Sequence, residues 1–205
     1  MTVSFVESDM TFGPYPDGRC FLLEQSDIYK NIKNNGIKTV EALLISNDSK
    51  KIFFIEAKST VPQPQAKYHK LNPGIENIEL LLDQLNQDQA HIQILKKARK
   101  ELGSFKNESW YIEIKEKFLY SLNLLFSIYL NRHANELPDA FNKIETDKLE
   151  IRLIIVIKSC KADHLKHINS HLATILKPVA QAWNLGPSAF HAINEEMARS
   201  RNIVA

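Results

Sequence analysis

Residues 37–60 read IKTVEALLISNDSKKIFFIEAKST, and this stretch decides the fold of the chain. Its two ends, Ile37–Ser46 and Lys51–Thr60, are rich in β-branched, aliphatic and aromatic residues, which is typical of β-strands. The residues between them, Asn47-Asp48-Ser49-Lys50, have the composition of a turn. The stretch therefore predicts a β-hairpin.

The register of this hairpin brings charged residues together. If residues 48–49 form a two-residue loop, Glu41 lies directly opposite Glu56, and Lys58 projects from the same face two residues later. Opposed carboxylates destabilise a hairpin unless a cation or a proton lies between them. The pair therefore indicates a site for Mg²⁺ or Mn²⁺, which prefer oxygen ligands. The alternative is a diagonal ion pair between Glu41 and Lys58 on a solvated face.

Two further residues complete the candidate site. Glu24 precedes the first predicted helix and could supply a third carboxylate from beside the hairpin. The Lys58 ammonium could position a water, help to deprotonate it, and offset the charge of a phosphate. The candidate catalytic residues are thus Glu24, Glu41, Glu56 and Lys58, and the three glutamates are the candidate metal ligands.

The remaining elements complete a mixed α/β pattern. The first 20 residues are rich in turn-forming residues. Apolar spacing, capping residues and buried runs predict helices at 26–34, 110–131, 163–183 (kinked near Pro178) and about 193–198, and a buried strand at 149–159. A hairpin followed by a strand that returns through a helical crossover predicts a central mixed β-sheet. The expected fold class is α/β (α+β), with helices on the sheet faces.

We expect one domain, 1–205, with a helical insertion at about 67–107, where the sequence becomes polar and rich in Gln and Asn. Apolar residues make up 44% of the chain and charged residues 24%, and the net charge is +2, so no strong electric field is expected. No apolar run approaches the roughly 20 residues that span a bilayer. Two cysteines and the absence of a secretory signal favour a cytoplasmic protein that does not bind membranes.

The hairpin motif resembles the PD-(D/E)xK nuclease-like superfamily. The matching residues are Val40-Glu41 and Glu56-Ala57-Lys58, and Glu24 resembles the extra acid that many members carry near the preceding helix. The local sequence at 21–26, 36–41 and 54–59 is also similar to that of a group of uncharacterised bacterial proteins assigned to this fold.

The resemblance implies a restriction-endonuclease-like core, a divalent metal ion and hydrolysis of phosphodiester bonds. Glu41 and Glu56 would then bind the metal, Lys58 would assist the attacking water, and Glu24 would tune the site or hold a second ion. Two features depart from the family pattern. Glu41 stands where Asp is usual and follows Val40 rather than Pro, and the Gln-x-x-x-Tyr signature of RecB-like members is missing from 110–131.

The expected function is that of a metal-dependent nuclease that acts on nucleic acid, DNA rather than RNA, in bacterial defence or DNA processing. One alternative is a nuclease-like scaffold that has lost catalysis and binds a protein or nucleic-acid partner. Another is an antitoxin- or immunity-type protein that docks through the apolar helix at 110–131. A homodimer, or a protein partner in a multi-protein system, is compatible with each of these functions.

Overall fold

The computed structural model describes residues 2–61 and 89–205. The chain divides into two compact units, one comprising Met1–Val61 with Ile114–Ala205 and the other Pro62–Glu113. Of the insertion predicted at about 67–107, residues 67–88 lie outside the described part of the chain, and residues 89–107 are helical.

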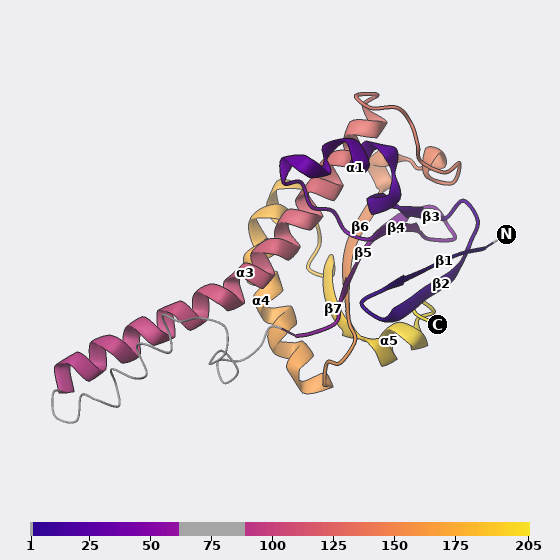
Figure 1. Cartoon of the computed structure of the whole chain (residues 1–205). Helices are drawn as coiled ribbons and strands as arrows, with labels where there is room; N and C mark the ends of the chain where they lie inside the picture. The colour runs from indigo at the N-terminus through magenta and orange to yellow at the C-terminus, as the bar shows by residue number, and fades with distance from the viewer. Residues whose placement is uncertain (1, 62–88) are drawn as a thin grey trace. The chain divides into compact units, whose positions relative to one another are not determined.

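The first unit is a mixed α/β structure (Figure 1). Two short 3₁₀ turns, η1 (Leu23–Gln25) and η2 (Lys33–Asn35), flank its first helix. In chain order, the strands and α-helices in the described part of the chain are β1 (Thr2–Glu7), β2 (Met10–Pro16), β3 (Cys20–Leu22), α1 (Asp27–Ile32), β4 (Ala42–Ile45), β5 (Lys51–Lys58), α3 (Gln89–Tyr129), β6 (Glu150–Ile157), α4 (Ala162–Ala182), β7 (Phe190–Asn194) and α5 (Glu195–Ser200).

Strands β3 to β7 form a five-stranded sheet in which spatial order follows sequence order. Strands β3, β4 and β5 are antiparallel neighbours, whereas β6 is parallel to β5 and β7 is parallel to β6. The predicted hairpin register is confirmed along β4, where Leu43 lies opposite Phe54 and Ile45 lies opposite Ile52. The predicted parallel return of the next strand is also confirmed. The sheet is therefore mixed, as expected.

The strand β4 is shorter than predicted, because it begins at Ala42 rather than at Ile37. Just before the strand, the Val40 N–H donates a hydrogen bond to Ser121 Oγ of α3, at 2.9 Å. Val40 is fully buried. Residues 39–41 are buried whereas Lys38 is exposed, so the second half of this segment packs inside the unit, and a helix side chain takes the place of a strand partner.

A β-hairpin that the sequence did not predict occupies the N-terminal region. Strands β1 and β2 are antiparallel, although β2 contains a glycine and two prolines. Gly13 adopts a φ of +96°, and a Cβ there would lie 2.7 Å from the Val3 carbonyl oxygen. The C-terminus supports β2 from its other side, since the Ala205 N–H donates to Thr11 O at 2.8 Å. Turn composition was misleading here because the hairpin depends on a contact with the distant end of the chain.

The C-terminal region also contains an unpredicted strand. Residues 190–194 form β7, and the final helix, α5, begins only at Glu195. The Asn194 side chain caps this helix by accepting a hydrogen bond from the Met197 N–H at 2.9 Å. The apolar Ile193, which the sequence suggested for the helix, is instead buried in the strand.

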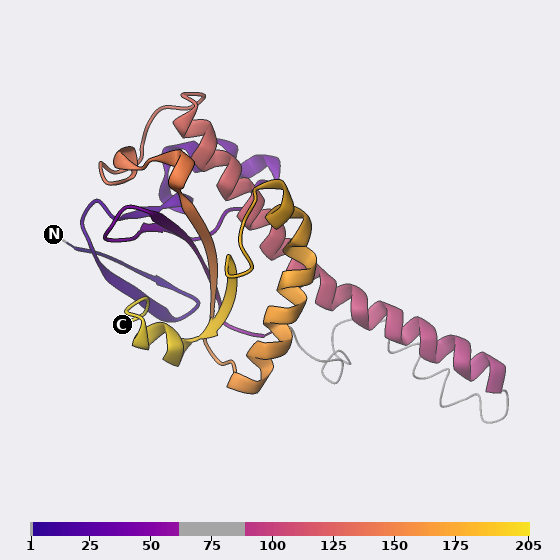
Figure 2. The same ribbon diagram turned by 180° about the vertical axis from the view of Figure 1, so that it is seen from behind.

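The sheet separates two layers of different composition (Figures 1 and 2). Helix α4 and the part of α3 that follows Ile114 cover one face, and the β1–β2 hairpin and α5 cover the other. Successive residues of β5 point to opposite faces. Phe54 packs edge to face on Phe118 of α3, with 5.1 Å between the ring centroids. Ile55, in contrast, belongs to the apolar cluster under the hairpin.

The described helices follow local sequence signals closely. Ser26 caps α1 by accepting from the Tyr29 N–H at 3.1 Å, and Gly36 ends the following 3₁₀ turn with a φ of 76°, so the predicted start and stop are confirmed. Helix α4 continues through Pro178. Among the described residues, no helix combines the length and the apolar character needed to cross a membrane.

Candidate functional site

Two acidic side chains lie together on the helix-covered face of the sheet. Glu56 follows Phe54 by two residues in β5 and therefore points to the same face, toward α3. Glu41 immediately precedes β4, and its N–H donates to the Ile55 carbonyl oxygen at 3.0 Å, which holds it against β5. The structure thus brings the two carboxylates together, as the hairpin register predicts.

An ammonium group from α3 lies between these carboxylates. Lys117 Nζ is 3.1 Å from Glu41 Oε1, and it is 3.0 Å and 3.1 Å from the two carboxylate oxygens of Glu56. Glu24 Oε1 lies 3.9 Å from the same nitrogen. One lysine therefore contacts all three of the glutamates that the sequence singled out.

Glu24 and Lys58 complete the cluster from two sides. The 3₁₀ turn η1 carries Glu24, and the Leu23 N–H beside it donates to the Glu41 carbonyl oxygen at 3.1 Å. Lys58 Nζ pairs with Glu56 Oε1 at 3.1 Å. We refer to Glu24, Glu41, Glu56, Lys58 and Lys117 as the acidic cluster.

The acidic cluster is buried at its centre and opens at one side. The Glu56 side chain is fully buried, and the side chains of Glu41 and Lys117 are 9% and 12% exposed. The Glu24 side chain, in contrast, is 38% exposed. Buried charges are costly unless they are paired, so the close contacts with Lys117 are required for these glutamates to ionise inside the protein.

Burial shifts the proton affinity of the cluster. It raises the pKa of Glu56 to about 7, although Lys117 and Lys58 oppose this shift. Burial, followed by the Glu41 carboxylate, also raises the pKa of Glu24 to about 7. Burial by itself would lower the pKa of Lys117, but the adjacent Glu56 and Glu41 outweigh it and raise that pKa. The cluster therefore combines a permanently charged lysine with carboxyl groups that exchange protons near neutral pH, which suits acid–base chemistry.

Sequence reasoning missed Lys117 and the residue that positions it. Ser121 is fully buried, donates to the Lys117 carbonyl oxygen at 2.7 Å, and accepts from the Val40 N–H at 2.9 Å. These bonds fix α3 against the segment that carries Glu41. The available signal was a serine within the buried helical stripe that contains Phe118 and Leu122, with a lysine one turn before it.

The donor atoms of the cluster fit a hard divalent cation, but a lysine holds the central position. Glu56 Oε1 is buried and accepts no well-oriented hydrogen bond within the described residues, which leaves an oxygen suited to a metal. Yet among the side chains that the structure describes, no three from His, Cys, Asp or Glu are arranged to hold an ion. An ion bound by Glu41 and Glu56 would require the Lys117 ammonium to move aside.

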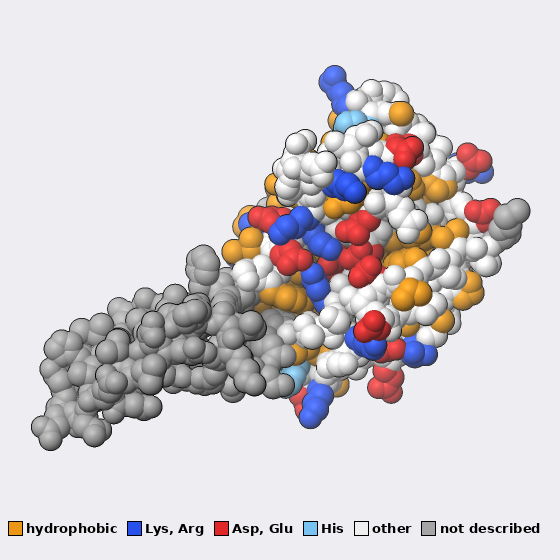
Figure 3. Space-filling model, viewed as in Figure 1, with side chains coloured by type: hydrophobic (Ala, Val, Ile, Leu, Met, Phe, Trp, Pro, Cys, Tyr) orange, Lys and Arg blue, Asp and Glu red, His pale blue; other side chains and the backbone are white. Residues whose placement is uncertain are grey.

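The surface around the cluster has no single sign of charge. On the face shown in Figure 3, acidic and basic side chains lie next to one another, and no broad basic area covers the described part of that face. This distribution agrees with the net charge of +2. A nucleic acid would therefore have to be held by a few local contacts rather than by a general positive field.

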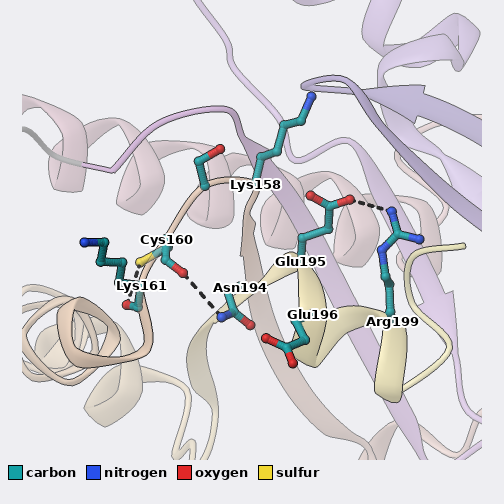
Figure 4. A pocket seen from close by; sticks show the side chains of 8 residues that line it. Lys158, Cys160, Lys161, Asn194, Glu195, Glu196 and Arg199 are labelled. Atoms are coloured by element: carbon teal, nitrogen blue, oxygen red, sulfur yellow. Dashed lines mark hydrogen bonds and ion pairs between the residues drawn. The ribbon is translucent and has the colours of Figure 1, made fainter.

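A shallow hollow of about 490 Å³ lies where β6 and β7 end (Figure 4). Its basic side chains do not converge, because the Lys158 and Lys161 ammonium groups point away from each other. Lys158 pairs with Asp9 at 3.4 Å, and Arg199 pairs with Glu195 at 2.6 Å. Since these charges are paired or divergent, the hollow is a weaker candidate than the acidic cluster.

No protein-family model matches the chain, and no curated protein or solved structure is significantly similar to it. The functional argument therefore rests on the geometry and the electrostatics of the acidic cluster.

Proposed function

We propose that this chain is a metal-dependent nuclease, acting on DNA rather than RNA, built on a restriction-endonuclease-like core. The observation that carries the proposal is the convergence of Glu24, Glu41 and Glu56 with two lysines at the end of β5. Three carboxylates and two ammonium groups at one partly open, low-dielectric position are typical of a catalytic site and costly for a purely structural one.

The topology supports the same proposal. An antiparallel set of β3, β4 and β5, followed by a helix and a strand parallel to β5, corresponds to the core that the sequence resemblance implies. Glu41 immediately precedes β4 and Glu56 lies near the end of β5, so the two acids of the motif come from neighbouring strands, which supports the proposal.

The chemistry follows from the positions of the side chains. Glu41 and Glu56, with Glu24 at the open side, would hold Mg²⁺ or Mn²⁺, which would supply charge neutralisation for a phosphodiester and activation of a water. Lys58, paired with Glu56 at 3.1 Å, would place a positive charge beside the phosphate. Glu24 is the most exposed of the three carboxyls, and its pKa of about 7 lets it exchange a proton with the substrate side of the site at neutral pH.

A second candidate function rests on Lys117. Its Nζ lies 3.1 Å from a carboxylate oxygen of Glu41 and 3.0 Å from one of Glu56, which are ordinary hydrogen-bond distances. The cation of the cluster is therefore already part of the chain. This arrangement favours a nuclease-like scaffold that has lost its metal and binds a protein or nucleic-acid partner. The two functions differ in whether Lys117 gives way to a divalent ion.

Cleavage assays test the proposal directly. Labelled duplex DNA, single-stranded DNA and RNA are incubated with the protein in Mg²⁺, Mn²⁺ or EDTA. We expect metal-dependent cutting of DNA that falls at least about 100-fold in Glu56→Gln, since even residues that merely orient metal ligands cost about 10- to 100-fold when replaced. Glu116→Gln is the matched control, because Glu116 lies on the same helix as Lys117 with a half-exposed side chain. Equal cutting by both variants would contradict the assignment.

Replacement of Lys117 separates the two functions. In a nuclease, Mn²⁺ raises the melting temperature of the wild-type protein, and it raises that of Lys117→Met further because the ammonium no longer competes for Glu41 and Glu56. In a scaffold that has lost its metal, Mn²⁺ leaves the wild-type melting temperature unchanged. Differential scanning calorimetry with and without Mn²⁺ provides the measurement, and an unshifted wild-type protein that also fails to cut would establish the scaffold.

A further inference from the structure

A cavity of about 710 Å³ lies on the opposite face of the sheet from the acidic cluster. Phe53 and Ile55 of β5 form part of its floor, and they alternate with Phe54 and Glu56, which point to the helix-covered face. The C-terminal end of β2 and residues 201–203 form its walls. In Figure 2 the β1–β2 hairpin and the C-terminus lie on the same side of the sheet.

The charged side chains around this cavity are basic. Arg19, Arg152, Arg201 and His191 line it, and none of the lining residues in the described part of the chain is acidic. They come from four separate places: the loop before β3, strand β6, strand β7 and the segment after α5. Because distant parts of the chain bring them to one cavity, the tertiary fold creates the positive charge there.

Two of the three arginines at the cavity have no carboxylate partner in the described part of the chain. The Arg19 guanidinium donates to the carbonyl oxygens of Ser46 and Asn47, at 2.6 Å and 3.2 Å, and these groups carry no net charge. Arg152, in contrast, is neutralised by its ion pair with Glu150. In the described part of the chain, no hydrogen bond or ion pair engages the exposed Arg201 guanidinium.

The histidine beside these arginines is half-buried, and burial is the main influence on its pKa. Burial lowers the pKa of His191, and the charges of Arg152 and Arg201 lower it further, against a hydrogen bond with the Ser188 backbone. His191 is therefore neutral at physiological pH and can accept or donate a hydrogen bond.

The rest of the lining is apolar and partly aromatic. Phe53 is half-buried and presents part of its ring to the cavity, next to Ile55 and Ile154. Tyr15 forms another part of the wall, and its hydroxyl donates to the Ile203 carbonyl oxygen at 2.5 Å, which fixes the ring in place. Ligand pockets of about 300–1,000 Å³ combine an apolar lining with a few convergent polar groups, and this cavity has both features.

We propose that this cavity binds a small phosphate monoester that carries a planar apolar group, with nucleotides as the best representatives of that class. The phosphate lies against Arg201, whose exposed guanidinium has no hydrogen-bond or ion-pair partner in the described part of the chain, since guanidinium groups form paired hydrogen bonds with phosphate oxygens. The planar group lies on Phe53 and the aliphatic floor, as bases do on aromatic side chains. The site is independent of the acidic cluster, since it lies across the sheet and contains no metal ligand.

Isothermal titration calorimetry in EDTA tests this proposal with three probes: adenosine monophosphate, adenosine and inorganic phosphate. We expect adenosine monophosphate to bind at least ten-fold more tightly than either fragment, because both the phosphate and the planar group contribute. Arg201→Ala is expected to weaken binding of the nucleotide about ten-fold or more, as a charge-assisted hydrogen bond is lost. Arg199→Ala is the matched control, since Arg199 lies two residues away and lines the other hollow.

Three outcomes would overturn the proposal: no binding of adenosine monophosphate at millimolar concentration, equal affinity for inorganic phosphate, or equal weakening by the two arginine variants. Because EDTA removes divalent ions, a loss of nuclease activity does not affect the result. Glu56→Gln should retain the nucleotide affinity of the wild-type protein, which shows that the acidic cluster is not the binding site.

Discussion

The two faces of β5 differ in that only the helix-covered face buries charged side chains of the acidic cluster beside its apolar ones. On the helix-covered face, Glu56 is fully buried and Lys117 is 12% exposed. On the hairpin-covered face, Ile55 and Phe12 are fully buried in an apolar cluster. Apolar burial stabilises a fold, whereas buried ion pairs often contribute nothing or destabilise it relative to apolar residues. The apolar cluster under the hairpin therefore stabilises the fold, whereas the buried charges under α3 are costly for stability.

The two faces also depend on different parts of the chain. Phe12 of β2 forms an antiparallel β-bridge with Val204, so the N-terminal hairpin and the C-terminal segment together cover the apolar face. The charged face is covered by α3, and the Lys117 ammonium of that helix lies within ion-pair distance of three carboxylates. We therefore expect the apolar face to respond to changes of volume and the charged face to respond to pH and cations.

The largest effect is expected on the apolar face. Phe12→Ala should lower the free energy of unfolding by about 3–5 kcal/mol, because Phe12 is fully buried and its ring stacks on Phe5 at 4.8 Å. Urea denaturation at pH 5 and pH 8 provides the measurement, and the loss should be the same at both. Val6→Ala in the same hairpin, where the side chain is 69% exposed, should change stability by less than about 0.5 kcal/mol. A loss below about 1 kcal/mol in Phe12→Ala would show that the hairpin is not part of the core.

A smaller effect, and one that depends on pH, is expected on the charged face. The pKa of Glu56 is raised from 4.5 to about 7 in the folded protein. The folded state then binds the proton more tightly than the unfolded chain, so the resulting stabilisation is complete below pH 4.5 and is lost as the pH rises through about 7. The free energy of unfolding should fall by about 1–3 kcal/mol over this range when no divalent ion is present.

Glu56→Gln should reduce this dependence, because the amide cannot titrate, and the part that remains comes from Glu24, whose pKa is also raised to about 7. Glu116→Gln should leave it unchanged, since that side chain is half-exposed. Urea denaturation between pH 4.5 and pH 8 in EDTA checks both variants. If the wild-type protein became more stable as the pH rose, the carboxyl of Glu56 would not be desolvated as the structure indicates.

The smallest effect is expected where α3 is joined to the segment before β4. Ser121→Ala leaves the buried Val40 N–H without its acceptor and should cost about 1–2 kcal/mol. Ser127→Ala is the control, because Ser127 Oγ bonds only to Leu124 O within the same helix, at 2.7 Å. Hydrogen exchange of the Val40 amide should accelerate in the first variant and remain slow in the second.

Much of the central sheet could be predicted from local sequence. The turn composition of Asn47–Lys50 and the apolar strands on either side determine the hairpin register, and the register places Glu41 near Glu56. The start of α1 follows from the capping preference of Ser26, and its end follows from the positive φ that glycine tolerates at Gly36. These signals succeed because each depends on residues that are close in the sequence.

The missed elements depend on residues that are far apart. Strand β2 is rich in Gly and Pro, and it becomes a strand because β1 and the C-terminal segment supply its partners. Strand β7 was not predicted, and its last two residues were assigned to the final helix, because its identity depends on pairing with β6. Backbone hydrogen bonds between distant segments do not require a periodic residue pattern in either segment, so one segment alone does not reveal them.

The sequence by itself determined which residues carry charge within apolar strands, and that pattern was sufficient to select Glu41, Glu56 and Lys58. Only the tertiary structure decided that the cation between the glutamates is Lys117, which is 61 residues away from Glu56 in the chain. It also decided that the basic residues around the second cavity meet at one place. The physical reason is that strand alternation is set by the local backbone, whereas the electrostatic environment of a buried charge is set by whatever the fold packs against it.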